Sequence, residues 1–179
     1  MSNAAKRILR SAAAPVLSGR QGDHFEYSLS MLGQTLGAKA IGVNVTRVPP
    51  GKAAFPLHHH RANEEHFFVL SGRGVLRVGA DTAPVQADDY IFNPPGDATE
   101  AHQLINTGDE DLVYLAFSTV QVPEVVGYPD SGKTGVRIAA GSDPGSRFLI
   151  RDDVPRAEYY DGEDGATVAA IVQRERGVV

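Results

Sequence analysis

Apolar and polar positions alternate in the middle of the chain, and the first alternating segment is the clearest. Between residues 40 and 47, Ile41, Val43 and Val45 take every second position, a period that predicts a β-strand. The strand should end at Val48-Pro49-Pro50-Gly51, because proline cannot donate a hydrogen bond to a neighbouring strand and a Pro-Gly pair favours a turn.

Further short strands follow at close spacing, separated by turns rich in glycine, proline and aspartate. No helical period interrupts them, so the pattern predicts an all-β fold, an antiparallel sandwich or barrel. The expected strands cover residues 54–60, 66–71, 73–79, 83–87, 89–93, 101–106 and 111–119.

The composition is ordinary for a globular protein and excludes several classes. With 179 residues, 42% of them apolar and 22% charged, the chain suits one domain with terminal arms. It has no cysteine, which excludes disulfides, thiolate metal sites and a cysteine nucleophile. A net charge of −5 argues against a nucleic-acid-binding protein. The sequence has neither a secretory signal nor an apolar run of membrane-spanning length, so we expect a cytoplasmic protein that binds no membrane.

The candidate chemistry lies in a cluster of histidines. Five of the six histidines fall between residues 58 and 102. In an extended strand His58 and His60 share a face, whereas His59 points away. Glu65 follows shortly after, and His102 could supply one more imidazole. Neutral imidazoles together with a carboxylate are the ligands of divalent transition metals, so we predict a metal site.

Two segments read Gly51…His58-x-His60-x4-Glu65-x6-Gly72 and Pro94-x-Gly96…His102-x3-Asn106. They resemble the two motifs of the cupin superfamily and together cover roughly residues 41 to 118. The second motif departs from the family pattern in two places: Asp88 stands where a glycine is usual, and five residues separate Gly96 from His102. The first motif has one extra residue between Gly51 and His58.

This resemblance implies a double-stranded β-helix, the jelly-roll barrel of cupins, that holds one divalent transition metal, Mn, Fe, Ni or Zn. Its ligands would be His58, His60, Glu65 and His102. Glu64 is an alternative to Glu65. Glu100 is an alternative to His102, if the unusual loop shifts the register.

We expect His66 to be a partly buried structural residue and His59 to lie outside the metal site. Residues that could line the barrel are Phe55, Phe67, Tyr90 and Phe117, and Arg47 could meet an anionic substrate; the alternative for each is core packing or surface charge.

The chain divides into three expected parts: an N-terminal arm (1–38), a barrel core (39–120) and a C-terminal extension (121–179). The extension is rich in loops and too short for a core of its own, so it should pack on the barrel or on a partner subunit. Residues 25–37 could form a strand pair or wrap a partner. Exposed sheet edges and the prevalence of two-fold dimers lead us to expect a homodimer.

The resemblance leaves two functions open. One is a metalloenzyme of the dioxygenase, decarboxylase or isomerase type, acting on a small organic acid, sugar or phenolic compound. The alternative is a non-catalytic module that binds or senses a small molecule or a metal. The sequence shows no acid–base residue that selects one reaction, so no catalytic residue is assigned.

Overall fold

The computed structural model describes residues 2–139 and 146–177, and antiparallel strands dominate it. The larger sheet contains six strands, and its centre is formed by strands predicted from the alternating pattern. In spatial order it runs β1 (Val16–Gln21), β2 (Phe25–Met31), β3 (Ile41–Val48), β10 (Leu112–Thr119), β5 (Glu65–Ser71) and β8 (Tyr90–Asn93). Within residues 25–37, where the sequence left the choice open, Phe25–Met31 form β2, which pairs with β1 as a hairpin and with β3, and so extends this sheet.

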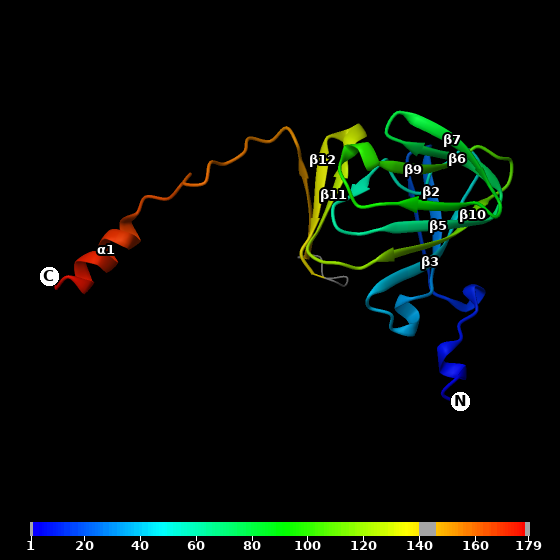
Figure 1. The fold of residues 1–179 in the computed structure, drawn as a ribbon, viewed down its shortest axis with the longest axis horizontal. Coiled ribbons are helices and arrows are strands. Elements are labelled where there is room, and N and C mark those ends of the chain that lie inside the picture. The colour runs from blue at the N-terminus through cyan, green and yellow to red at the C-terminus, as the bar shows by residue number, and fades with distance from the viewer. Residues whose placement is uncertain (1, 140–145, 178–179) are drawn as a thin grey trace.

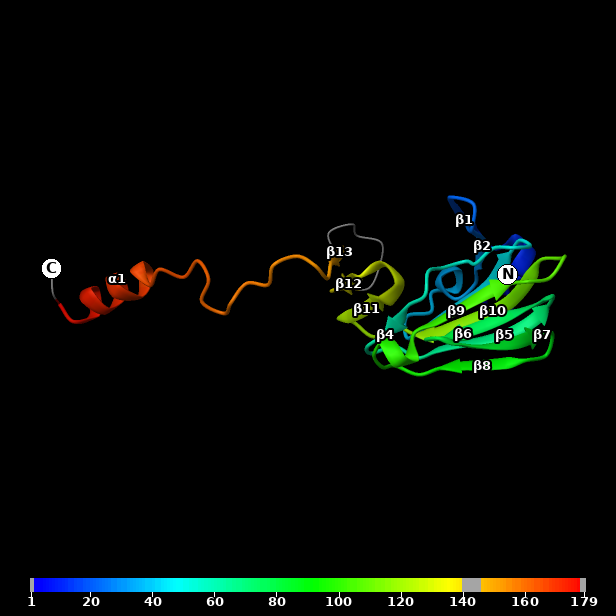
Figure 2. The same cartoon turned by 90° about the horizontal axis from the view of Figure 1, so that it is seen from above.

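The opposing layer consists of two smaller sheets. One runs β7 (Asp81–Gln86), β6 (Arg73–Val78) and β9 (His102–Asn106), and the other β4 (His59–His60), β11 (Glu124–Tyr128), β12 (Lys133–Arg137) and β13 (Arg147–Arg151). A single antiparallel bridge between His58 and His102 connects them. The two layers form a jelly-roll barrel, with β11 and β12 at one side of it (Figures 1 and 2). The protein is therefore an all-β double-stranded β-helix, as expected.

Helical segments are short. Single 3₁₀ turns cover η1 (Ala5–Arg7), η2 (Ser11–Ala13), η3 (Gln34–Leu36), η4 (Ala98–Glu100) and η5 (Pro129–Ser131), and α1 spans Ala166–Glu175. Among the described residues, no helix is long and apolar enough to cross a membrane.

The hydrophobic core lies between the layers. Val48, Val69 and Leu112 have no exposed surface. The rings of Phe67 and Tyr114 belong to the same cluster, and their centres lie 5.1 Å apart. Burying one such side chain stabilises the fold by roughly 1.5–3 kcal/mol. Burial also raises the pKa of the Tyr114 phenol. This packing fixes the inner face of β5, from which the candidate metal site is built.

The expected C-terminal extension is split in two by the structure. Strands β11 and β12 lie against the barrel, and η5 is fastened to it by Arg77, which donates two hydrogen bonds of 2.7 and 2.9 Å to Asp130. Residues 147–177 are all exposed, and beyond β13 the chain runs away from the barrel to α1 (Figure 1). This last part does not pack on its own barrel.

Candidate metal centre

Strand β5 brings the candidate carboxylate into the barrel. Its side chains alternate, so that Glu65 shares the inner face with the buried Phe67 and Val69, while His66 points outward. The glycine that follows this strand, Gly72, has φ +84°, and a Cβ atom there would lie 2.5 Å from the Asp111 carbonyl oxygen. A side chain at this position would therefore displace the turn that ends β5.

Backbone hydrogen bonds hold the three histidines in place. The His58 amide donates to the His102 carbonyl at 3.2 Å, and the His102 amide donates back to His58 at 2.8 Å. The His60 carbonyl accepts a 2.7 Å hydrogen bond from the amide of Gly96, in the Pro-Pro-Gly loop. Both segments that carry imidazoles are thus fixed to each other before any ligand binds.

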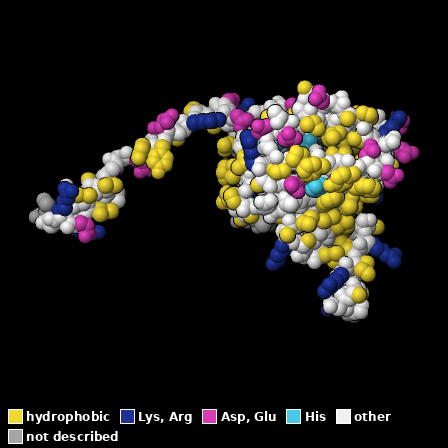
Figure 3. All heavy atoms as spheres, viewed as in Figure 1, with side chains coloured by type: hydrophobic (Ala, Val, Ile, Leu, Met, Phe, Trp, Pro, Cys, Tyr) yellow, Lys and Arg dark blue, Asp and Glu magenta, His cyan; other side chains and the backbone are white. Residues whose placement is uncertain are grey.

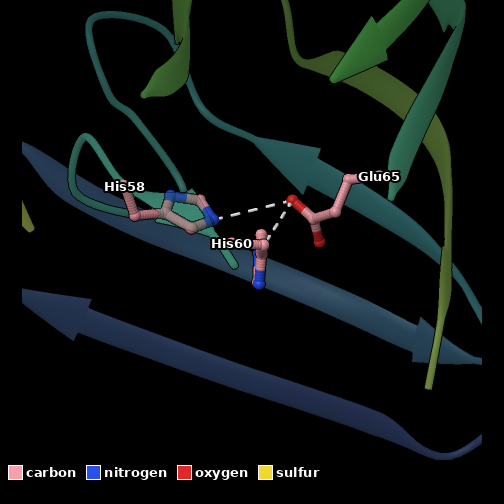
Figure 4. A group of neighbouring side chains, drawn as sticks. All are labelled: His58, His60 and Glu65. Atoms are coloured by element: carbon pink, nitrogen blue, oxygen red, sulfur yellow. Dashed lines mark ion pairs between the residues drawn. The ribbon is translucent and has the colours of Figure 1, made fainter. Parts of the chain in front are cut away.

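The three imidazoles converge on one carboxylate oxygen. Glu65 Oε2 lies 3.6 Å from His58 Nε2, 3.5 Å from His60 Nε2 and 3.1 Å from His102 Nε2. Figure 4 shows His58 and His60 directed toward Glu65 from the neighbouring segment. The candidate ligand atoms of these three residues all lie within 4.8 Å of one another. The spacing suits a single small cation in their midst.

The hydrogen bonds of the other ring nitrogens show why a cation belongs there. His58 Nδ1 lies 2.9 Å from the Pro56 carbonyl and His102 Nδ1 lies 3.2 Å from the Glu100 carbonyl. A carbonyl oxygen only accepts, so each Nδ1 carries a hydrogen and, in the neutral ring, each Nε2 presents a lone pair. Lone pairs facing a carboxylate oxygen repel it, unless a proton or a metal ion lies between them.

His60 provides a second indication. Both of its ring nitrogens are buried without a hydrogen-bond partner. A buried polar atom in this state is costly, and coordination to a metal ion would satisfy it. The site's donors, imidazole nitrogen and carboxylate oxygen, fit a divalent transition metal.

The ionisation of the site follows from the same contacts. Burial alone would raise the pKa of Glu65, but its contacts with His102, His58 and His60 hold that pKa well below the usual range. Burial alone would lower the pKa of His60, yet Glu65 and Glu124 raise it. Glu65 is thus a carboxylate at neutral pH, as metal coordination requires.

The remaining histidines lie outside this cluster. His59 is 6% exposed, its Nδ1 lies 3.0 Å from the Gly96 carbonyl, and burial lowers its pKa. His66 packs on the outer face between aromatic rings, with Phe117 stacked 5.0 Å away, and Glu64 lies beside it with its Oε2 3.7 Å from His66 Nε2. Glu64 is therefore turned away from the site that contains Glu65.

The loop with extra residues keeps the register of the second motif. Residues Ala98–Glu100 form the 3₁₀ turn η4, and the Asp97 carboxylate caps it by accepting a 2.9 Å hydrogen bond from the Thr99 amide. Glu100 meets the site through its backbone carbonyl, so the imidazole of His102 contacts Glu65. Asp88, where the family pattern has glycine, adopts the left-handed conformation (φ 73°) that favours glycine.

A pocket of about 540 Å³ opens over the histidines. It is lined by Phe55 and His58 on the barrel side and by one face of β11, β12 and β13 on the other. A shallower hollow of about 630 Å³ at β6 and β7 contains no histidine. Of the residues expected to line the barrel, Phe55 borders the pocket and Phe67 lies in the core. The expectation was wrong for Tyr90 and Phe117, which pack around His66 outside, and for Arg47, which is exposed.

Sequence reasoning missed Glu124, a buried acid on β11. Its Oε1 accepts hydrogen bonds from the amides of Arg61 (2.9 Å) and Ala62 (3.4 Å), its Oε2 accepts one from Asn63 Nδ2, and its Oε1 lies 3.8 Å from His60 Nδ1. A carboxylate behind a metal-binding imidazole orients the ring. The only signal for it was a lone acid in a loop-rich segment, far in sequence from the histidines.

Comparisons with known proteins agree with this geometry. Residues 44–118 match the family model described as cupin domain. An oxalate-binding protein from Thermotoga maritima is 36% identical over 70 residues, which cover 39% of this chain and 54% of that protein. The chain spans about half the length of the curated relatives it matches.

Two crystal structures resemble this chain over more of its length. A candidate sugar phosphate isomerase from Acidithiobacillus ferrooxidans is 25% identical, with a TM-score of 0.73, and the match covers 87% of this chain and 99% of that one. A sugar phosphate isomerase of the cupin superfamily from Silicibacter pomeroyi is 26% identical, with a TM-score of 0.64, and the match covers 74% and 81%. The matched domain model and these folds show that the chain contains a cupin domain at residues 44–118.

Proposed function

We propose that the protein is a metal-dependent enzyme of the isomerase type that acts on a small sugar-like molecule. The metal would be one divalent transition ion, Mn²⁺, Fe²⁺, Ni²⁺ or Zn²⁺, held by His58, His60, Glu65 and His102. The observation that carries the proposal is the set of three imidazole Nε2 atoms around Glu65 Oε2, at the floor of a pocket large enough for a small organic molecule.

A divalent ion in this position supplies a Lewis acid that polarises a substrate oxygen. The chain's own residues prepare the place: Glu65 stays ionised, and the carbonyls of Pro56 and Glu100 fix the tautomers of His58 and His102. Glu124 Oε1 lies 3.8 Å from His60 Nδ1 and adds negative charge beside that ring, while the hydrogen bonds that its oxygens accept make it a weaker base for a substrate proton.

The isomerase type is favoured among cupin reactions because of what the structural neighbours share. Both proteins named as sugar phosphate isomerases match this chain beyond the barrel motifs, over 87% and 74% of its length. The pocket wall contributed by β11–β13 falls outside residues 44–118, and a similarity that extends past those residues concerns more than the metal ligands.

The test has two stages. Metal analysis of the purified protein should find close to one divalent transition ion per chain, and the loaded protein should interconvert aldose and ketose phosphates in a proton NMR assay. His60→Ala should abolish both metal and turnover. A protein that takes up no Mn²⁺, Fe²⁺, Ni²⁺ or Zn²⁺ on titration contradicts the proposal at its first stage; a loaded protein without turnover contradicts the second.

A second candidate is a non-catalytic module that binds a small dicarboxylate. The observation that favours it is the 36% identity to an oxalate-binding protein over 70 residues. Calorimetric binding of oxalate to the metal-loaded protein, with the oxalate recovered unchanged and no turnover of sugar phosphates, would select this candidate over the enzyme.

We further propose a homodimer built around the 39–120 core. The outer face of the larger sheet is rich in hydrophobic side chains over β5 and β10 (Figure 3). Tyr90 and Phe92 on the edge strand β8 are 58% and 51% exposed, and Leu70 of β5 is 47% exposed. The C-terminal segment also exposes Tyr159 and Tyr160. Hydrophobic faces and sheet edges of this kind are covered in stable assemblies, and a second copy covers both.

A further inference from the structure

The wall of the pocket opposite the histidines is one face of the sheet formed by β11, β12 and β13. In a strand every second side chain shares a face. The pocket is lined mainly by such sets, to which β12 adds Val136: Glu124, Val126 and Tyr128 of β11; Lys133, Gly135 and Arg137 of β12; Arg147 and Leu149 of β13. Strand pairing sets them in rows, with Glu124 opposite Arg137 and Arg137 opposite Arg147.

Three cations stand on this wall without an acidic partner among the residues that the structure describes. Among the described residues, no carboxylate lies within ion-pair distance of Lys133, Arg137 or Arg147. Glu124 lies in the same row, but its oxygens accept hydrogen bonds from the Arg61–Asn63 segment. In a protein with a net charge of −5, a set of uncompensated cations in one pocket is a local departure from the overall balance.

Arg137 and Arg147 are directly opposed on neighbouring antiparallel strands. Like charges in this position destabilise a sheet, unless an anion lies between them. The Arg137 Nε is also buried without a hydrogen-bond partner. A guanidinium group forms paired hydrogen bonds with carboxylate or phosphate oxygens, and such an oxyanion would satisfy Nε and relieve the repulsion together.

The wall also faces the candidate metal ligands. Arg137 lines the same pocket as His60 and Glu65. Lys133 lies 5.5 Å from the centre of the Tyr128 ring, which stacks 6.2 Å from His58. Between Lys133 and Arg137 stands Gly135, where a Cβ atom would lie 3.0 Å from Leu149 Cδ2. A side chain there would crowd Leu149 and also Tyr128, whose Cε2 lies 3.4 Å from the Cβ position.

We propose that Arg137, together with Arg147 and Lys133, forms an oxyanion subsite that binds a phosphate or carboxylate group of the substrate while other substrate oxygens face the histidines. The proposal rests on the function proposed above and names its substrate class: a small molecule with an anionic group at one end. These residues lie outside the segment that matches the cupin model, so they would distinguish this chain's substrate from those of other cupins.

The test measures anion binding separately from metal binding. Full-length protein is stripped with a chelator and titrated calorimetrically at low salt with glucose 6-phosphate, malonate and neutral glucose, and metal uptake is measured on the same preparations. Arg137→Gln should weaken binding of the preferred anion about 10- to 100-fold, the range for a lost hydrogen bond to a charged group. Arg137→Lys keeps the charge but not the paired donors, so it should lose less anion affinity than Arg137→Gln does. Arg73→Gln removes an arginine that pairs with Asp109 outside the pocket, so it should leave both anion affinity and metal uptake unchanged.

The outcomes separate the two proposals. The subsite is supported by three results together: an anion binds, glucose does not bind, and Arg137→Gln lowers the affinity for that anion. The Arg137→Gln variant should still take up metal within threefold of wild type. Which anion binds more tightly then tells phosphate from carboxylate. It is overturned if Arg137→Gln and Arg147→Gln bind both anions as wild type does, or if glucose binds as tightly as its phosphate. If the protein takes up no metal but still binds an anion through Arg137, the metal-dependent function fails and the subsite stands.

Discussion

The adjacent residues His59 and His60 should separate metal binding from stability. His60 Nε2 lies 3.5 Å from Glu65 Oε2, and neither of its ring nitrogens has a hydrogen-bond partner. His59 points the other way, 6% exposed, with its ring against Gly127 and its Nδ1 donating to Gly96 at 3.0 Å. Replacing each by alanine therefore removes a different kind of contact.

The magnitudes follow from those contacts. His59→Ala loses a hydrogen bond worth about 0.5–1.5 kcal/mol and leaves a cavity beside Gly127, so the free energy of unfolding should fall by about 2–4 kcal/mol. For a chain of this length that corresponds to a melting temperature lower by roughly 5–15 °C. His60→Ala also leaves a cavity, but it removes two unsatisfied buried nitrogens, and the two effects offset each other.

The assay compares the metal-free proteins, because a bound metal would add its own stabilisation. Denaturant melts give the free energy of unfolding, and competition with a chelator gives metal affinity. His60→Ala should lose at least about 100-fold in affinity, more than the 10–100-fold typical of residues that only support a ligand, and His59→Ala less than about 10-fold. Equal losses of metal from the two variants would refute the opposite orientations of the two rings.

Three other predictions follow from the same geometry. Glu65→Gln should remove most metal affinity, whereas Glu64→Gln, outside the cluster, should retain it; the reverse order in a metal titration would mean that the carboxylates are wrongly assigned. Asp88→Gly should keep or slightly increase stability, because residue 88 has φ 73°, whereas Asp88→Val should lose about 1–3 kcal/mol in a denaturant melt; a valine variant as stable as wild type would contradict the backbone conformation. Light scattering at micromolar concentration should give twice the chain mass of 19.1 kDa, and a mass near 19.1 kDa would exclude the dimer.

The barrel strands could be predicted because their signal is local. Alternation in β3 and the glycine and proline turns between later strands mark most of the strands between residues 41 and 119. The orientation of Glu65 relative to Glu64 could also be predicted, since a half-buried strand places every second residue inside. Motif spacing and strand period are both properties of short segments, and they need no knowledge of distant contacts.

The lining of the barrel could not be predicted in the same way. Tyr90 and Phe117 are aromatic residues near the motifs, and hydrophobicity alone makes them candidates for the interior. Their side is set by register: Phe117 lies opposite His66, which is on the outer face. Register across strands depends on pairings between segments about 50 residues apart, and no pattern within one strand determines it.

Strands β11 and β12 were missed for a related reason. β12, with the sequence Lys-Thr-Gly-Val-Arg, has no alternating apolar pattern, since its inner face carries Lys133, Gly135 and Arg137. A strand whose inner face is made for a polar pocket does not look like a half-buried strand. The feature that would bind a ligand is the same feature that hides the strand from hydrophobic periodicity.

The two walls of the pocket thus differ in how they are specified. The wall with the histidines is built from closely spaced residues on strands whose register the core fixes, and such a site can persist while the rest of the chain diverges. The wall with Arg137 depends on a hairpin held by β4 and by the Arg77–Asp130 contact. A change in that hairpin alters which molecules fit without disturbing Glu65 or its imidazoles. Selectivity among substrates should therefore respond to substitutions in β11–β13, and metal affinity to substitutions in β4, β5 and β9.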